Sequence, residues 1–377
     1  MQRRSALNCL VPAVLLAFAL PTATLRAEEV VGPEDDVDQL LVAAEETARA
    51  TNRVLIPVPL VNPQIGAGLG LASVWFYTPP GSTRPWTTGV GGLASSNGSF
   101  GFGGLHQMSL ARDRYRVEVQ GGYARLNTNY FATGPVSGET SVGIEQTPAL
   151  FEGRVTTRIA PRLQMGARFR FLNMQTRVRD PASVPADIDL SDLENYRLGA
   201  IGPLLTYEKT DRAMNPREGT RISGQWLFAL PALGSDTAYN KAIVTANQFV
   251  AVNDRTVAAF RASACAASRN APFFDLCLFG ASANLRGYES GRFRDHASWA
   301  VQTELRRALG GKFGAVAFAG VGGVAPSLGG IGGEPLLPAA GMGLRYEVAR
   351  DYGINLRLDV AVGRDSRAVY VSLGEAF

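Results

Sequence analysis

The stretch Ile354-Asn-Leu-Arg-Leu-Asp-Val-Ala-Val362 alternates with a period of two: aliphatic side chains occupy the even positions, and Asn355, Arg357 and Asp359 occupy odd ones. Successive side chains of a β-strand point to opposite faces, so this pattern predicts a strand with one apolar and one polar face. The same alternation recurs in other segments, at 115–120, 163–169 and 342–348. We therefore predict an all-β chain.

A water-soluble antiparallel β-protein has the same period and is the alternative to a membrane barrel. Three features favour the barrel. The polar faces are dense in Arg, Glu and Asp, as in a water-filled lumen, and aromatic residues cluster near predicted strand ends, as in interfacial girdles. The chain also ends on an alternating strand that closes with Phe377, which we interpret as a C-terminal barrel signal.

Counting such segments backward from Phe377 predicts a transmembrane antiparallel β-barrel of sixteen strands. The predicted strands lie near 368–377, 353–363, 336–348, 312–324, 297–308, 256–265, 240–252, 219–230, 196–209, 162–178, 148–160, 129–133, 114–126, 99–110, 86–96 and 64–77. The short segment at 129–133 is included because an even count returns both termini to the periplasm. With this count, brief turns such as 96–99 and 126–129 are periplasmic, and the longest connection, 266–296, is on the outer side.

The N-terminus has the organisation of a secretory signal. Residues 1–27 contain a basic start, a short apolar run and an alanine-ending segment. The apolar run is shorter than the roughly 20 residues that a membrane-spanning helix needs, so we expect cleavage. Residues 28–56 are predicted to be a periplasmic leader, flexible or with a short helix, and residues 57–377 the outer-membrane barrel.

The charge balance and the scarce histidines exclude several function classes. Without three arginines of the signal, 34 of the 37 Lys and Arg residues remain against 33 Asp and Glu, so the mature chain lacks the basic footprint of a nucleic-acid binder. His106 and His296 lie far apart in the sequence, and neither belongs to an evident catalytic or metal-binding constellation. The glycine-rich runs 320–323 and 329–333 do not resemble a phosphate-binding loop. We expect no nucleic-acid partner, catalytic residue, metal or cofactor.

Two cysteines remain once the signal is removed, Cys265 and Cys277. Thiols tend to pair in the oxidising compartment for which the chain is bound, so a disulfide between them is expected. Their proximity in the sequence does not decide the matter, and two free thiols are the alternative.

The longest predicted loop contains Asn284-Leu-Arg-Gly-Tyr-Glu-Ser-Gly-Arg-Phe-Arg-Asp295. Leu285-Arg-Gly-Tyr288 followed by Gly291-Arg-Phe-Arg-Asp295 resembles the loop motif of the bacterial surface antigen superfamily, which comprises outer-membrane assembly factors such as BamA and TamA and two-partner-secretion transporters. The motif residues carried over by this resemblance are Leu285, Arg286, Gly287, Tyr288, Gly291, Arg292 and Asp295.

Three further segments resemble the same family over the rest of the barrel. The segment 211–220 is similar to a family turn and strand entry, and 373–377 to the family's terminus. The opening at 56–63 is similar to members that lack periplasmic POTRA domains, and we expect this chain to be such a short member.

The resemblance implies that the long outer loop folds into the lumen and that Arg286 contacts carboxylates on the two following strands. It assigns Glu304 as the first partner, and the alternation of the strand after the loop directs Glu304 into the lumen. A guanidinium and a carboxylate form strong, often bidentate contacts. Where the family has Phe-x-Asp-x-Gly, this chain has Phe318-Ala-Gly-Val-Gly322, so we expect the second partner to be missing. A solvated loop arginine is the alternative for Arg286.

The function implied by the resemblance is assistance in assembly, insertion or translocation of protein or lipid at the outer membrane, without enzymatic activity. Expected partners are outer-membrane lipid, unfolded protein clients and a separate periplasmic factor. The separate factor is expected because we predict a short member without the periplasmic domains that receive clients in other members. A passive or gated pore is one alternative, because sixteen strands can enclose an aqueous channel. A lipid-acting barrel enzyme is the other.

Overall fold

The computed structural model describes most of the chain beyond residue 52. The described residues are 53–62, 65–80, 86–112, 114–131, 141–184, 195–212, 215–280, 284–288, 291–349 and 354–377. The predicted signal at 1–27 lies outside them, as does the predicted leader except for its last residues. Those last residues belong to a strand that begins at Arg53, slightly before the predicted boundary at Pro57.

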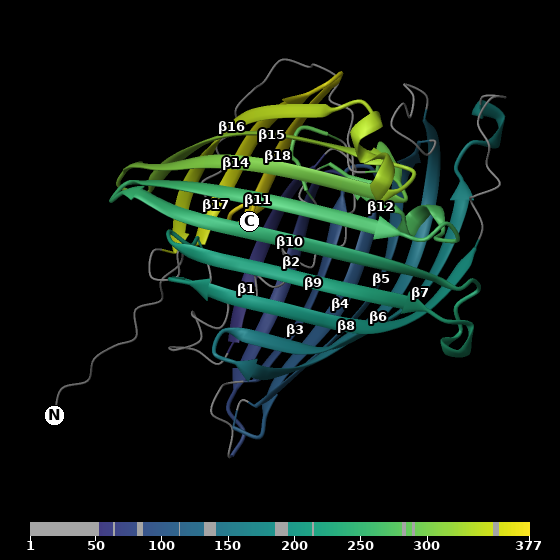
Figure 1. Ribbon diagram of the computed structural model, residues 1–377, viewed down its shortest axis with the longest axis horizontal. Helices are drawn as coiled ribbons and strands as arrows, with labels where there is room; N and C mark the ends of the chain where they lie inside the picture. Colours follow the sequence, from purple (N-terminus) through teal and green to yellow (C-terminus); the bar gives the residue numbers. More distant parts are fainter. Residues whose placement is uncertain are drawn as a thin grey trace.

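Sixteen antiparallel strands close into a barrel, in agreement with the predicted fold class (Figure 1). Its strands are β1 (Arg53–Asn62), β2 (Gly66–Tyr77), β3 (Trp86–Ser95), β4 (Phe100–Leu110), β5 (Tyr115–Tyr130), β6 (Val142–Ala160), β7 (Leu163–Val178), β8 (Tyr196–Thr210), β9 (Gly219–Ala229), β10 (Tyr239–Asn253), β11 (Thr256–Ala267), β14 (Ala297–Gly310), β15 (Phe313–Ala325), β16 (Leu337–Ala349), β17 (Ile354–Gly363) and β18 (Ser366–Leu373). The connection between β11 and β14 contains a separate two-stranded sheet of β12 (Cys277–Phe279) and β13 (Phe293–Asp295). Short 3-10 turns occur at Pro181–Ser183, Pro231–Leu233, Phe273–Asp275 and Leu328–Gly333. Within the described ranges, no helix combines the length and apolar character needed to cross a membrane.

The two faces of the strands follow the alternation in the sequence. On β17, Leu358 and Val360 face outward and are 42% and 46% exposed, whereas Arg357 and Asp359 are buried inside the barrel. The outside therefore presents an apolar surface suited to lipid, and the inside holds the charged groups.

Two errors in the predicted strands cancel in the count. β5 is continuous from Tyr115 to Tyr130, so the predicted turn at 126–129 and the separate strand at 129–133 are wrong. β1 was not predicted, because prolines inside a segment argue against a strand. With these changes the turn at 96–99 moves to the same end of the barrel as the long β11–β14 connection, the outer end. The chain's last residue lies at the opposite, periplasmic end, where most connections are short.

The prolines of β1 determine which of its edges can form hydrogen bonds. β1 is matched to β2 at every residue from Arg53 to Asn62. Proline has no N–H, so the hydrogen bonds to β2 must use the backbone N–H groups of even-numbered residues. The backbone N–H and C=O groups of odd-numbered residues then point toward the other neighbour, β18. Pro57 and Pro59 therefore remove two donors from the edge that faces β18.

The seam between β1 and β18 is the weakest junction of the barrel. Its register contains one matched pair, Val61 with Val371, whereas β18 is matched to β17 at eight positions. β18 ends at Leu373, and Gly374 adopts a left-handed φ of 85° that turns the last residues inward. The predicted strand at 368–377 is thus too long, and the part of β1 from Arg53 to Val58 extends past the end of β18.

Candidate functional site

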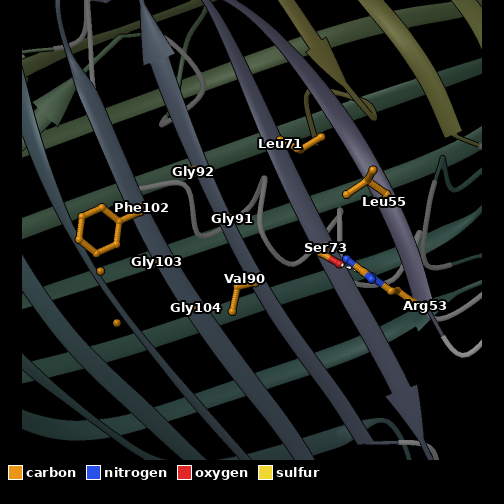
Figure 2. A pocket seen from close by; sticks show the side chains of 12 residues that line it. Arg53, Leu55, Leu71, Ser73, Val90, Gly91, Gly92, Phe102, Gly103 and Gly104 are labelled. Atoms are coloured by element: carbon orange, nitrogen blue, oxygen red, sulfur yellow. Dashed lines mark hydrogen bonds between the residues drawn. The ribbon is translucent and has the colours of Figure 1, made fainter.

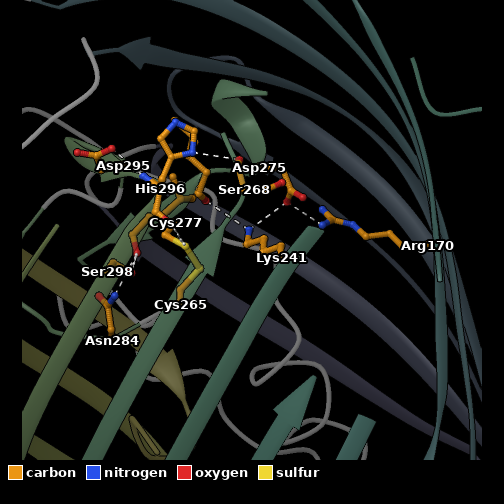
Figure 3. The surroundings of a disulfide bond; sticks show 12 residues. Arg170, Lys241, Cys265, Ser268, Asp275, Cys277, Asn284, Asp295, His296 and Ser298 are labelled. Carbon is orange, nitrogen blue, oxygen red and sulfur yellow. Dashed lines mark hydrogen bonds and ion pairs between the residues drawn. A yellow bond between two sulfur atoms is a disulfide. The ribbon is translucent and has the colours of Figure 1, made fainter. Parts of the chain in front are cut away.

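The β11–β14 connection folds into the lumen, as the resemblance implied. Its apolar side chains pack in one cluster with inward residues of β14, β15 and β16: Phe279, Leu285, Tyr288, Phe293, Ala300, Val324, Leu337 and Ala339. A disulfide joins Cys265 at the end of β11 to Cys277 of β12 (Figure 3). This covalent link fixes the point at which the loop leaves the barrel wall.

Arg286 anchors the loop to two strands. Its side chain is 3% exposed and forms ion pairs with Glu304 on β14 and Asp359 on β17. The guanidinium also lies over the ring of Phe318, with its Cζ 3.6 Å from the ring centroid. Such charge-assisted contacts in a buried site hold the loop firmly because neither charge can be left without its partner.

The next two residues of the motif fit closely against the wall. Gly287 has a φ of 114°, and a Cβ there would lie 2.9 Å from the Cβ of Ala339, so the position requires glycine. Its N–H donates to the Tyr370 hydroxyl at 3.1 Å. The Tyr288 hydroxyl accepts from the Arg364 N–H at 2.9 Å and donates to the Pro338 carbonyl.

The expectation that Arg286 lacks a second carboxylate is wrong. The position where the family has aspartate is Gly320, and a Cβ there would lie 2.5 Å from both Leu285 Cδ1 and the Val301 carbonyl. Leu285 thus occupies the space that an aspartate side chain would need. The second carboxylate comes instead from Asp359, two strands farther along the barrel wall.

Glu304 and Asp359 belong to a larger buried network. Arg306 donates to Glu304 at 2.6 Å, and Arg345 bonds to Asp359 and, at 2.8 Å, to Glu375 in the C-terminal tail. Each carboxylate that receives Arg286 is therefore also bound to an arginine of the wall. The loop and the tail are therefore bound to the same buried network of charges. If either one left, it would leave buried charges of the wall without a partner.

The C-terminal residue lies inside the barrel. Phe377 is 6% exposed, and its main-chain oxygen accepts from Arg306 at 2.6 Å. Its ring packs near Phe249 and receives the guanidinium groups of Arg261 and Arg306 at 5.7 Å and 5.4 Å from the centroid. The prediction that Phe377 closes the last strand is therefore wrong, and its role as a barrel signal stays a prediction.

A second anchor ties the loop to the opposite wall. Asp275 pairs with Arg170 of β7 at 3.0 Å and Lys241 of β10 at 3.1 Å, and it accepts from the Tyr239 hydroxyl at 2.6 Å (Figure 3). Burial opposes ionisation of this carboxyl, but the charges of Lys241 and Arg170 outweigh it and hold the pKa of Asp275 below its usual range. The loop thus reaches across the lumen from one wall to the other.

The remaining predicted motif residues serve the return of the loop to the wall. Gly291 has a φ of 81° at the turn before β13, and Arg292 donates to the Asp365 carbonyl at 3.0 Å. Asp295, at the end of β13, is matched to Cys277 and accepts from the His296 N–H at 2.7 Å. Asp295 thus lies beside the disulfide, whereas Arg292 contacts the turn between β17 and β18.

Comparison with known protein families identifies this architecture. The profile of the Omp85 superfamily domain matches residues 85–374. The chain belongs to the Omp85 superfamily. Omp85 barrels reside in the bacterial outer membrane, and so does this one. No curated protein sequence matches the chain.

Solved structures of similar fold include one of BamA and two of CdiB. BamA from Haemophilus ducreyi lacking POTRA domains 1–3 has a TM-score of 0.60 and 12% identity over 86% of this chain and 70% of its own. CdiB from Escherichia coli has a TM-score of 0.60 and 11% identity over 85% and 62%, and CdiB from Acinetobacter baumannii has 0.54 and 12% over 85% and 59%. The chain thus spans less than two thirds of either CdiB.

The two histidines of this Omp85 barrel lie outside its lumen network. His106 shares a hydrogen bond of 2.9 Å with Thr88 and packs near Trp86 on the outer face, and His296 bonds to the Ser268 carbonyl at 3.1 Å. In the described part of the chain, no group of three or more His, Cys, Asp or Glu side chains is placed to hold a metal ion.

Sequence reasoning missed several members of the charge network. Arg306, Arg345 and Asp359 occupy polar positions of alternating strands, so their inward direction could be read from the sequence. Their convergence could not, because it depends on the register between strands and on the inward turn at Gly374. Asp275 had no signal beyond its position in the long loop.

Proposed function

We propose that this Omp85 barrel assists the insertion or translocation of polypeptides at the outer membrane by offering the edge of β1 at the seam. The observation that carries the proposal is the single matched pair between β1 and β18. An exposed strand edge binds other extended chains by adding a strand, and unpaired backbone groups in a membrane are costly. A client strand that pairs with β1 would satisfy those groups.

The prolines support a transient interaction rather than a permanent one. Pro57 and Pro59 leave carbonyl acceptors on the free edge but remove the donors beside them. A strand that pairs there forms fewer hydrogen bonds than on an ordinary edge, and it can therefore leave. The family membership and the likeness to BamA and CdiB point in the same direction.

The loop favours this proposal over a steady open pore. It is bound at one wall through Arg286 and at the other through Asp275, so it obstructs the lumen. A separate periplasmic factor would deliver clients to the periplasmic end, where β1 extends beyond β18. His296 meets Ser268 through the serine's main-chain carbonyl and Asp295 through its own main-chain N–H, and His106 bonds to the Thr88 hydroxyl. These contacts are not those of a serine–histidine–carboxylate triad, so they do not support the lipid-acting enzyme.

A cross-link across the seam tests the proposal. Val61 and Val371 are directly opposite, so Val61→Cys with Val371→Cys should form a disulfide that locks the seam. In a strain that depends on this variant, we expect other barrel or exported proteins to fall in the outer-membrane proteome and to recover with reductant. Val371→Cys alone and the wild type with reductant are the controls. A full proteome with the seam demonstrably locked would refute the proposal.

A further inference from the structure

The outer face of the first strands contains a groove of about 840 Å³ that neither the loop nor the seam explains (Figure 2). Its lining comes from β1 to β5. Exposed apolar side chains form its walls, among them Leu55, Leu71, Val90 and Phe102, which is 62% exposed. The volume lies within the range of small-molecule sites, roughly 300–1,000 Å³.

Glycines form the floor of the groove. Gly92 is matched to Leu71 and Phe102, and Gly104 to Val90 and to a further glycine of β5, so these positions share the outward face with the apolar walls. A membrane barrel ordinarily presents apolar side chains to lipid at such positions. Here the bare backbone leaves a hollow that opens toward the acyl-chain region.

A cation stands at the periplasmic rim of the groove. Arg53 donates through Nε to the Ser73 hydroxyl at 3.0 Å, and its guanidinium lies 5.2 Å from the centroid of the Trp75 ring. Figure 2 shows Arg53 directed toward Ser73, beside Leu55. A guanidinium matches the geometry of a phosphate and can bind it through two N–H groups.

Aromatic side chains place this rim at the depth of lipid headgroups. Tyr77 packs against Trp86 at 6.2 Å, and Trp86 against His106 at 5.7 Å, on the same face and toward the same end as Trp75. Tyr and Trp concentrate where a membrane meets water. Arg53 therefore lies at the level of phosphates, and the glycine floor lies deeper in the bilayer.

We propose that this groove binds one anionic phospholipid, with its phosphate at Arg53 and an acyl chain across the glycine floor. A zwitterionic lipid fits less well, because its own cation offsets the charge that Arg53 recognises. Arg53 and Leu55 belong to the part of β1 that extends past the end of β18. The bound lipid therefore also stabilises the packing of that part of β1 on β2. The site is separate from the strand edge, so its binding can be measured without any client.

Lipid retention by the purified barrel tests the assignment. Native mass spectrometry of wild type with equal phosphatidylglycerol and phosphatidylcholine should show one retained phosphatidylglycerol. Arg53→Gln should lower its affinity roughly fivefold, the effect of about one surface Arg contact with anionic lipid. The matched control is Arg114→Gln, because Arg114 also lies over an aromatic ring, 5.5 Å from the Tyr115 centroid, but does not line the groove. Equal loss in both variants, or equal retention of both lipids, would overturn the proposal.

Two further measurements separate the groove from the charge. Gly92→Val should abolish retention by filling the floor, and its Cβ would meet the Gly101 carbonyl at 3.3 Å, a contact that a small shift can relieve. Phosphatidylglycerol with a photoreactive acyl chain should label wild-type peptides from 86–110, whether or not Gly92→Val folds. Displacement of the lipid by inorganic phosphate would assign the site to free phosphate, and labelling spread over all strands would refute a defined groove.

Discussion

Restoring a donor at the seam should slow its opening by a predictable amount. With Val61 opposite Val371, the continuing register sets Pro59 opposite Leu373, the last residue of β18. Pro59→Thr supplies an N–H that faces the Leu373 carbonyl. One backbone hydrogen bond contributes about 0.5–1.5 kcal/mol, which corresponds to a roughly two- to twelvefold smaller opening constant.

The same register provides the control. Pro57 would stand opposite Glu375, but Glu375 is held in the lumen by Arg345 at 2.8 Å and by Asn355 at 2.6 Å. Pro57→Thr therefore restores a donor that has no acceptor across the seam. The two variants make the same chemical change at neighbouring positions and differ in what the new N–H can reach.

Amide hydrogen exchange of peptides from β18 measures the effect. In detergent or lipid discs, Pro59→Thr should slow exchange at 366–373 by roughly two- to twelvefold, in proportion to the smaller opening constant. Pro57→Thr should exchange like wild type. Equal protection in the two variants, or none in Pro59→Thr, would show that the seam is not limited by the missing donor.

Three further predictions concern the loop. Arg286→Ala leaves two buried carboxylates without one of their arginines and should destabilise the loop by about 3 kcal/mol. We expect faster proteolysis within 268–296 and larger, erratic single-channel currents. Unchanged currents and proteolysis would contradict the role of Arg286 as an anchor. Asp275 has a lowered pKa in the folded state, so its ion pairs contribute their full stabilisation at any pH above its unfolded-state pKa of about 4. That stabilisation is lost only as the pH falls toward the folded-state pKa. Loop proteolysis should therefore be the same at pH 7 and pH 5 and increase only in stronger acid. The double variant Cys265→Ser with Cys277→Ser should lower the free energy of unfolding of the loop by about 2–4 kcal/mol, seen as a lower melting temperature. A melting curve identical to that of wild type would contradict a stabilising role of the disulfide.

The sequence predicts the faces of the barrel better than its junctions. Alternation correctly placed Arg357 and Asp359 inside the barrel, because the direction of a side chain within one strand does not depend on how that strand pairs with its neighbours. It could not place Asp359 beside Arg286, because the two meet only when β14 to β17 are set in register. β1 was missed because Pro57 reads as a strand breaker, although proline is compatible with a strand whose one edge is largely unpaired.

The motif was informative where it specified local shape. The contact between Arg286 and Glu304 follows from an inward loop and an inward glutamate, both evident in the sequence. Gly320 was interpreted as the loss of a partner, whereas it is the space that Leu285 fills. Residues 374–377 could not be placed, because the strand pattern runs unbroken up to Leu373 and the inward turn depends on one glycine dihedral.

The shared charge network divides the wall into parts of unequal stiffness. Arg286, Arg306 and Arg345 connect β14, β16 and β17 from within through the loop and the C-terminal tail, so we expect that arc to move as one piece. The arc from β2 to β4 has paired glycines where braces would stand, among them Gly91 opposite Gly103. Strain from a widening seam will accordingly be absorbed by the N-terminal arc, which bends while its counterpart stays rigid.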